Sequence, residues 1–195
     1  MTLFFTTFLK FFFLLTPFFV MSTFLAMTPG YTEGQRRKLA FKVVLGVLIV
    51  SVVIFLLGNG IFSIFGITLD AFRVGTGVLM MLNAVSLVRG RDIAATEELE
   101  SDIAIVPLAI PVTVGPATTG ALLVMSGELN SWNDGVLSLL AVGAAIALVG
   151  ILLLLSTYLE KLVKKQGLSI LSKVTGLILS ALAAQIFFAG LKGML

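Results

Sequence analysis

The chain of 195 residues contains no cysteine and no histidine. It therefore cannot form disulfides, use a thiolate nucleophile, bind a metal through histidine or use histidine in acid–base catalysis. Charged side chains are also scarce, at 12% of residues, whereas soluble domains carry about 25%. These absences argue against most enzyme classes. We expect no catalytic residue, no metal site and no cofactor.

Apolar residues make up 58% of the chain, and they form uncharged runs of about 20 residues, the length that crosses about 30 Å of hydrocarbon. This pattern predicts an all-α integral membrane protein with one domain over residues 1–195 and the lipid bilayer as its surroundings. Six transmembrane spans are expected. They cover residues 3–27, 39–57, 70–88, 104–127, 136–158 and 174–191.

Most Lys and Arg residues lie in alternate connections, namely those between spans one and two, three and four, and five and six. The positive-inside rule places these connections in the cytoplasm and both termini outside. Residues 91–103 are rich in Asp and Glu and are predicted to form an acidic cytoplasmic connection. Because the basic residues are dispersed over several turns, we expect no nucleic-acid partner.

Prolines interrupt two of the apolar runs, at Pro17 in span one and between Pro107 and Pro116 in span four. Proline removes a backbone donor and clashes with the carbonyl one turn earlier, so a helix must kink or break there. In hydrocarbon the freed backbone groups must be satisfied by protein or by a water-filled cavity. We therefore predict that spans one and four are discontinuous and build a polar site at membrane depth.

A shift of 99 residues superposes Pro17 on Pro116 and Gly77 on Gly176. The halves of this repeat, residues 1–90 and 104–195, each contain three spans. Because three is an odd number, the second half must enter the membrane inverted. A 3+3 inverted repeat with broken helices at matching positions is typical of transporters, whose binding site lies near the bilayer midplane.

The polar side chains inside the spans are neutral, which suits a small zwitterionic solute. Helix N-termini attract a carboxylate, and freed carbonyls accept an ammonium. Threonine hydroxyls can instead bond to their own helix, and the two amides can instead join helices. The candidate substrate-binding residues are Thr16, Pro17, Asn83, Thr113, Gly115, Pro116, Thr118 and Gln185.

Asp70 and Arg73 lie three residues apart at the start of span three. They are candidates for an outer gate. The alternative is an interfacial acid at a helix start beside an arginine that extends toward water.

Three stretches of the chain carry further motifs. They are Pro-Leu-Ala-Ile-Pro at 107–111 followed by Gly115 and Pro116, the segment 65–77, and Gly176, Gln185 and 190–193. Together these motifs resemble those of the MarC family of inner-membrane proteins. The sequence departs from the family at the first break, where Thr16 replaces an Asn or Asp and Ser22 replaces a second proline.

The resemblance implies a six-span protein, some of whose relatives move small neutral amino acids such as glycine and alanine. Our hypothesis is a secondary transporter of such solutes, driven by a proton or Na+ gradient, since no ATP-binding motif is present. Two alternatives stay open, an efflux protein for another small solute and a membrane scaffold that transports nothing.

Overall fold

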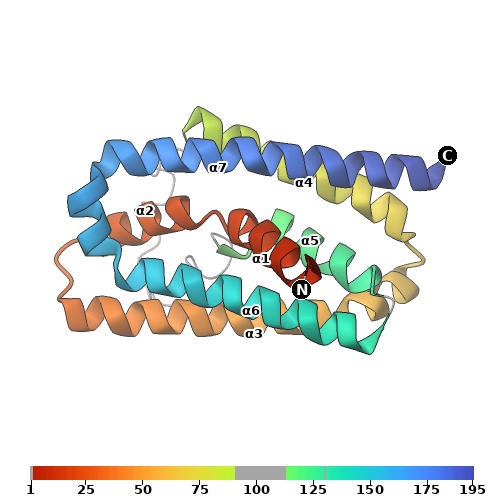
Figure 1. The fold of residues 1–195 in the computed structure, drawn as a ribbon, viewed down its shortest axis with the longest axis horizontal. Coiled ribbons are helices and arrows are strands. Elements are labelled where there is room, and N and C mark those ends of the chain that lie inside the picture. The colour runs from red at the N-terminus through yellow and green to blue at the C-terminus, as the bar shows by residue number, and fades with distance from the viewer. Residues whose placement is uncertain (1, 91–112, 130) are drawn as a thin grey trace.

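The computed structural model describes residues 2–90, 113–129 and 131–195, and every regular element in these ranges is an α-helix (Figure 1). Five segments are long and apolar enough to cross a membrane, which confirms the prediction of an all-helical, multi-pass integral membrane protein. They are Thr2–Met27, Glu33–Gly58, Leu69–Arg89, Trp132–Leu154 and Ser156–Met194. The helices are α1 (Thr2–Leu14), α2 (Pro17–Met27), α3 (Glu33–Phe65), α4 (Leu69–Arg89), α5 (Pro116–Gly127), α6 (Trp132–Leu154) and α7 (Ser156–Met194).

These five segments overlap predicted spans one, two, three, five and six. Of the predicted fourth span, residues 104–127, the structure describes only the part from Thr113 onward, where α5 forms. Pro107, Pro111 and the predicted acidic connection at 91–103 lie outside the described residues.

Two predicted connections are wrong in length. Residues 159–173 belong to α7, in which Lys164 alone has non-helical dihedral angles (φ 59°, ψ 164°). Similarly, α3 continues beyond the predicted end at residue 57 to Phe65, where Gly66 ends it in the left-handed conformation. Residues 159–173 of α7 are rich in charged and polar side chains, so no apolar run reveals that the helix includes them. In α3, Gly58, Asn59 and Gly60 interrupt the apolar run without ending the helix.

Three helices, α3, α4 and α6, begin at side-chain caps. Thr32, Thr68 and Ser131 each accept a hydrogen bond from a backbone N–H three residues later. Such caps satisfy donors that the first helical turn leaves unpaired. They fix where α3, α4 and α6 start and therefore keep the connections tight.

The connections alternate between two ends of the bundle (Figure 1). Residues 28–32 and Leu155 lie at one end, and residues 66–68, Glu128, Leu129 and Ser131 lie at the other, together with the C-terminus. We call the first the basic end and the second the ion-pair end. The basic end carries Arg36, Arg37, Lys38 and Lys42 of α3, Arg89 of α4, and Lys161, Lys164, Lys165 and Lys173 of α7.

Helices α4 and α7 pack most extensively, and glycines permit their close approach. A Cβ at Gly77 would lie 2.7 Å from Phe187 Cβ and 2.9 Å from the Ala183 carbonyl oxygen. A Cβ at Gly176 would lie 2.9 Å from Val88 and 3.0 Å from the carbonyl oxygen of Ala84. Small residues play this part in membrane helix pairs because packing drives their association.

The core lies around α1 and α2, whose buried side chains include Phe11, Met21 and Phe24. Large apolar side chains cover the outside, such as Ile64 at 81% exposure and Phe41 at 69%. Extensive exposed apolar surface is unfavourable in water. It is the expected surface of a bundle that faces lipid.

Candidate functional site

The first apolar segment is interrupted between α1 and α2. Thr16 has left-handed backbone angles (φ 47°, ψ 56°), and Pro17 is the first residue of α2. The amide of Thr16 still donates to the Phe13 carbonyl at 3.0 Å, and no side chain caps the start of α2. A β-branched residue rarely adopts this conformation, so Thr16 marks a sharp local departure from the helix.

The second interruption lies at the start of α5. Gly115 is extended (φ −83°, ψ −179°), and Pro116 begins the helix without a side-chain cap. The Thr118 hydroxyl donates to the Thr113 carbonyl at 3.3 Å. An uncapped helix start presents backbone N–H groups and the positive end of the helix dipole to whatever lies before it.

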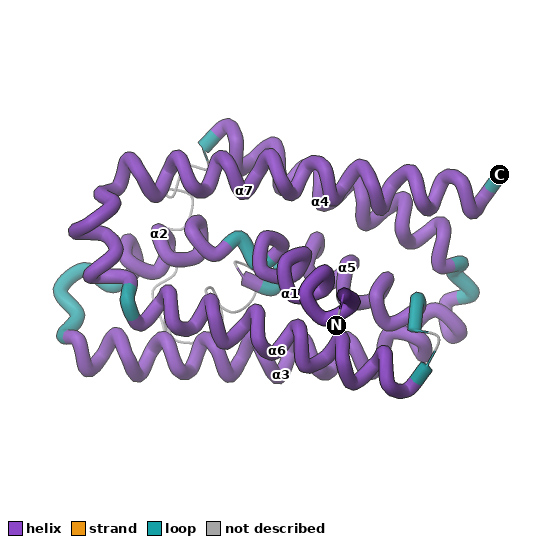
Figure 2. Tube along the Cα trace, viewed as in Figure 1, coloured by secondary structure: helices purple, strands orange, loops and turns teal. Residues whose placement is uncertain are grey.

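The two non-helical stretches meet in the middle part of the bundle, where Figure 2 shows them between the longer helices. They enclose, with one face of α4, a cavity of about 220 Å³ that we call the central cavity. Its described lining includes six of the eight candidate substrate-binding residues. These six are Thr16, Asn83, Thr113, Gly115, Pro116 and Thr118.

Two candidate residues lie elsewhere. Pro17 is buried at the start of α2, behind the cavity wall that Thr16 contributes. Gln185 of α7 lines a different cavity, described below. Sequence reasoning did not select Ser86, which lines the central cavity one helical turn after Asn83. Their spacing of three residues on α4 was the available signal, since such residues share a helix face.

The described lining of the central cavity contains no charged side chain. It offers the Asn83 amide, which can donate and accept, the Thr16 and Ser86 hydroxyls, and the backbone around Gly115. These groups can bind a solute without net charge. They provide no fixed countercharge that would select a cation over an anion.

Arg73 joins two helices at the ion-pair end. Its Nε and Nη2 donate to Glu128 Oε1 at 3.1 and 2.8 Å, and its Nη1 donates to Asp70. The pair with Glu128 links the start of α4 to the C-terminal end of α5 and is partly exposed, at 22% and 48% for the two side chains. Glu128 was not among the sequence-predicted residues, because 55 positions separate it from Arg73.

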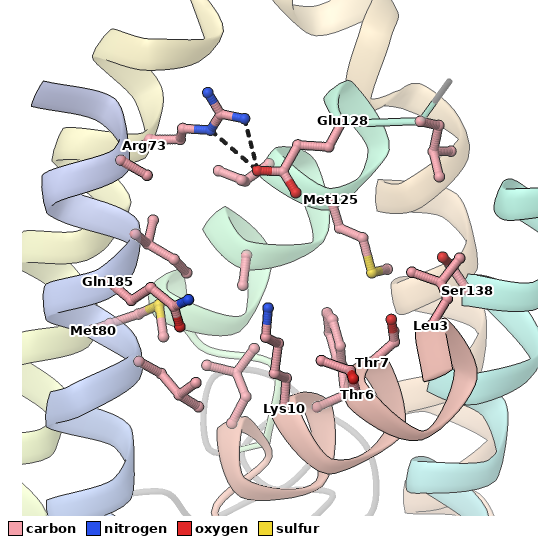
Figure 3. A pocket seen from close by; sticks show the side chains of 18 of the residues that line it. Leu3, Thr6, Thr7, Lys10, Arg73, Met80, Met125, Glu128, Ser138 and Gln185 are labelled. Carbon is pink, nitrogen blue, oxygen red and sulfur yellow. Dashed lines mark hydrogen bonds and ion pairs between the residues drawn. The ribbon is translucent and has the colours of Figure 1, made fainter. Parts of the chain in front are cut away.

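A second cavity, of about 490 Å³, lies beside this pair (Figure 3). We call it the ion-pair cavity. Its polar lining comes from four helices and from Glu128, the residue that caps the C-terminal end of α5. The polar residues are Thr6, Thr7 and Lys10 of α1, Arg73 of α4, Glu128, Asp134 and Ser138 of α6, and Gln185 of α7.

Arg36 makes the corresponding contacts at the basic end. Its Nη2 donates to the carbonyl of Thr28, the residue that caps α2, at 3.0 Å. Its Nη1 donates to the Thr157 hydroxyl at 2.7 Å. Arg36 therefore joins the end of α2 to the starts of α3 and α7, in a partly buried setting.

The sequence comparisons agree with the membrane architecture. The family model described as MarC family integral membrane protein matches residues 1–195. The chain belongs to the MarC family. No solved structure matches it.

Curated MarC-type relatives come from archaea and bacteria and carry the name UPF0056 membrane protein. MJ1677 of Methanocaldococcus jannaschii is 32% identical, over 93% of this chain and 92% of its own length. YhcE of Escherichia coli is 28% identical, over 96% and 91%. YvbG of Bacillus subtilis is 28% identical, over 88% and 85%. The relationship to the MarC family therefore extends over nearly the whole chain.

Proposed function

We propose that this protein is a secondary transporter of small neutral amino acids, of the size of glycine or alanine, and that the central cavity is its solute site. The observation that carries the proposal is the meeting of two helix interruptions with Asn83 around one uncharged cavity. Discontinuous helices that meet at a cavity within the membrane are typical of transporter binding sites.

The size of the central cavity supports a small solute. Its volume of about 220 Å³ is below the range of about 300–1,000 Å³ that drug-sized ligands occupy. The uncapped start of α5 supplies N–H groups for a carboxylate. The carbonyl oxygen of the Asn83 amide is an acceptor for an ammonium group.

The contacts of two glycines support the 3+3 inverted repeat that alternating access requires. Gly77 of α4 contacts Ala183 and Phe187 of α7, whereas Gly176 of α7 contacts Ala84 and Val88 of α4. A shift of 99 residues converts each set of contacts into the other. This reciprocity is the relationship expected between two halves related by a two-fold axis in the membrane plane.

The proposal includes the expected orientation, with the basic end in the cytoplasm and both termini outside in an inner membrane. It includes transport driven by a proton or Na+ gradient, and it assigns the protein no enzymatic activity. The Arg73–Glu128 pair is the proposed outer gate, with Asp70 as the second partner of Arg73.

Counterflow tests this function. Purified protein in liposomes, loaded with unlabelled alanine, should accumulate labelled alanine transiently, and protein-free liposomes should not. Glycine and serine should compete, while larger solutes should not. Accumulation that only an unrelated solute supports would instead indicate an efflux protein of other specificity. The absence of flux for every solute would indicate a scaffold.

A further inference from the structure

Lys10 is a cation within the first candidate span, at Thr2–Met27. Among the residues that the structure describes, it has no hydrogen-bond or ion-pair partner. A charged side chain at this depth is costly unless it faces a water-filled cavity or a countercharge. Figure 3 shows the Lys10 side chain extending from α1 into the ion-pair cavity, below the Arg73–Glu128 pair.

The surroundings of Lys10 contain a second donor and an apolar wall. Gln185 extends from α7 into the same cavity (Figure 3). Met80, Leu182 and Ile186 provide apolar surface beside these polar groups. Cavities of this volume with a few convergent polar groups on apolar walls are the usual form of small-molecule sites.

The charges of the cavity indicate the chemistry of its ligand. Arg73 binds Glu128 and Asp70, and Asp134 accepts from the Ser131 hydroxyl, which leaves Lys10 as the cation of the described lining that is available to an incoming anion. An ammonium and an amide N–H both bind a carboxylate through charge-assisted hydrogen bonds, because the acceptor is ionised. Glu128 and Asp134 are the negative counterparts in the same lining for a positively charged group.

We propose that the ion-pair cavity is a second solute site, in which Lys10 and Gln185 bind the carboxylate of a small zwitterion or short aliphatic acid. This site is separate from the central cavity and its occupancy does not require transport. A solute would meet it at the ion-pair end of the bundle, before the central cavity.

Protection of Lys10 from chemical labelling tests the site in the wild-type protein. The reagent is a water-soluble N-hydroxysuccinimide acetate, and modification of each lysine is measured by mass spectrometry. Glycine betaine is the probe because it carries a carboxylate and no reactive amine. At about ten times its Kd, betaine should slow acetylation of Lys10 about tenfold. Lys192, exposed near the C-terminus, should react at an unchanged rate.

Choline provides the matched control, because it keeps the quaternary ammonium and replaces the carboxylate with a hydroxyl. It should protect nothing. Propionate distinguishes the two ligand sources, since equal protection by propionate indicates a site for carboxylic acids in general, and weaker protection indicates a site for zwitterions. Unchanged Lys10 acetylation with both betaine and propionate, or equal protection by choline, would overturn the proposal.

A variant tests the second donor. Gln185→Leu should raise the betaine concentration needed for half-protection of Lys10 by about tenfold to a hundredfold, the loss expected for one hydrogen bond to a charged group. Gln166→Leu changes an exposed glutamine elsewhere on α7 and should have no effect. Equal behaviour of the two variants would remove Gln185 from the site. If the wild-type protein shows no counterflow while betaine still protects its Lys10, the transport role is refuted and the second solute site is not.

Discussion

The short helices α2 and α5 begin alike, and their beginnings and ends also differ in instructive ways. Each begins with a proline directly after a non-helical residue. Before α2 that residue is Thr16 in the left-handed conformation, whereas before α5 it is Gly115 in an extended one. The first interruption therefore carries backbone strain at Thr16, whereas the second carries none at Gly115.

Their far ends are both bound by an arginine from a neighbouring helix. Arg36 donates to the Thr28 carbonyl at the α2 end and to the Thr157 hydroxyl of α7, in a partly buried setting. Arg73 binds the α5 end through an ion pair that is partly exposed. Exposed ion pairs contribute little to stability and weaken with salt. From this comparison we expect the Arg73 contact at the ion-pair end to break more easily than the Arg36 contact at the basic end.

The largest losses of stability should come from changes to the α4–α7 contact at Gly77 and Gly176. Gly77→Leu and Gly176→Leu each place a side chain against backbone of the facing helix. Each should lower the free energy of unfolding in detergent by about 3 kcal/mol, the upper range for overpacking. Gly75→Leu is the control, since a Cβ there meets nothing within 4 Å. Unequal losses at positions 77 and 176 would argue against a repeat.

The sequence predicted the all-helical, multi-pass architecture and five of the membrane spans, because apolar runs act locally. The continuation of α7 through residues 159–173 was missed, since a charged helix outside the bilayer has no apolar run to reveal it. The placement of Gln185 away from Asn83 was also missed. Local patterns do not specify which face of α7 turns toward which cavity.

Loss of the basic-end contact should have the next largest effect. Arg36→Met removes the bonds to Thr28 and Thr157 and should lower the free energy of unfolding by about 2 kcal/mol. Arg37→Met changes its exposed neighbour and should cost less than about 0.5 kcal/mol. Thermal unfolding in detergent measures both. Equal stability of the two variants would mean that Arg36 does not secure this end.

Relief of strain at the first interruption should have a smaller effect of opposite sign. Thr16→Gly removes the left-handed penalty at φ 47° and should raise the free energy of unfolding by about 1 kcal/mol. Thr6→Gly, within the regular helix α1, should instead lower it by about 0.4 kcal/mol. If both substitutions destabilise the protein, Thr16 is not strained.

Salt should change the access of a reagent at the ion-pair end alone, and this is the smallest of the predicted effects. Single cysteines at Ser138, which lines the ion-pair cavity, and Ser22, near the basic end, report access to a soluble thiol reagent. Between 0.1 and 1 M salt the screening length falls from about 10 to 3 Å, and labelling of Ser138→Cys should rise by up to about fivefold. Arg73→Met should abolish this dependence. A matching rise at Ser22→Cys would remove the contrast between the ends.

Counterflow by the Gly115→Leu variant tests most directly the claim that the two interruptions form one solute site. The leucine would fill the central cavity beside Thr16 and Asn83, so alanine counterflow should be lost while the thermal unfolding temperature stays near that of the wild type. Gly75→Leu, the same change at an exposed position on α4, should transport normally. Wild-type counterflow by Gly115→Leu would show that the interruptions are structural and that the solute binds elsewhere.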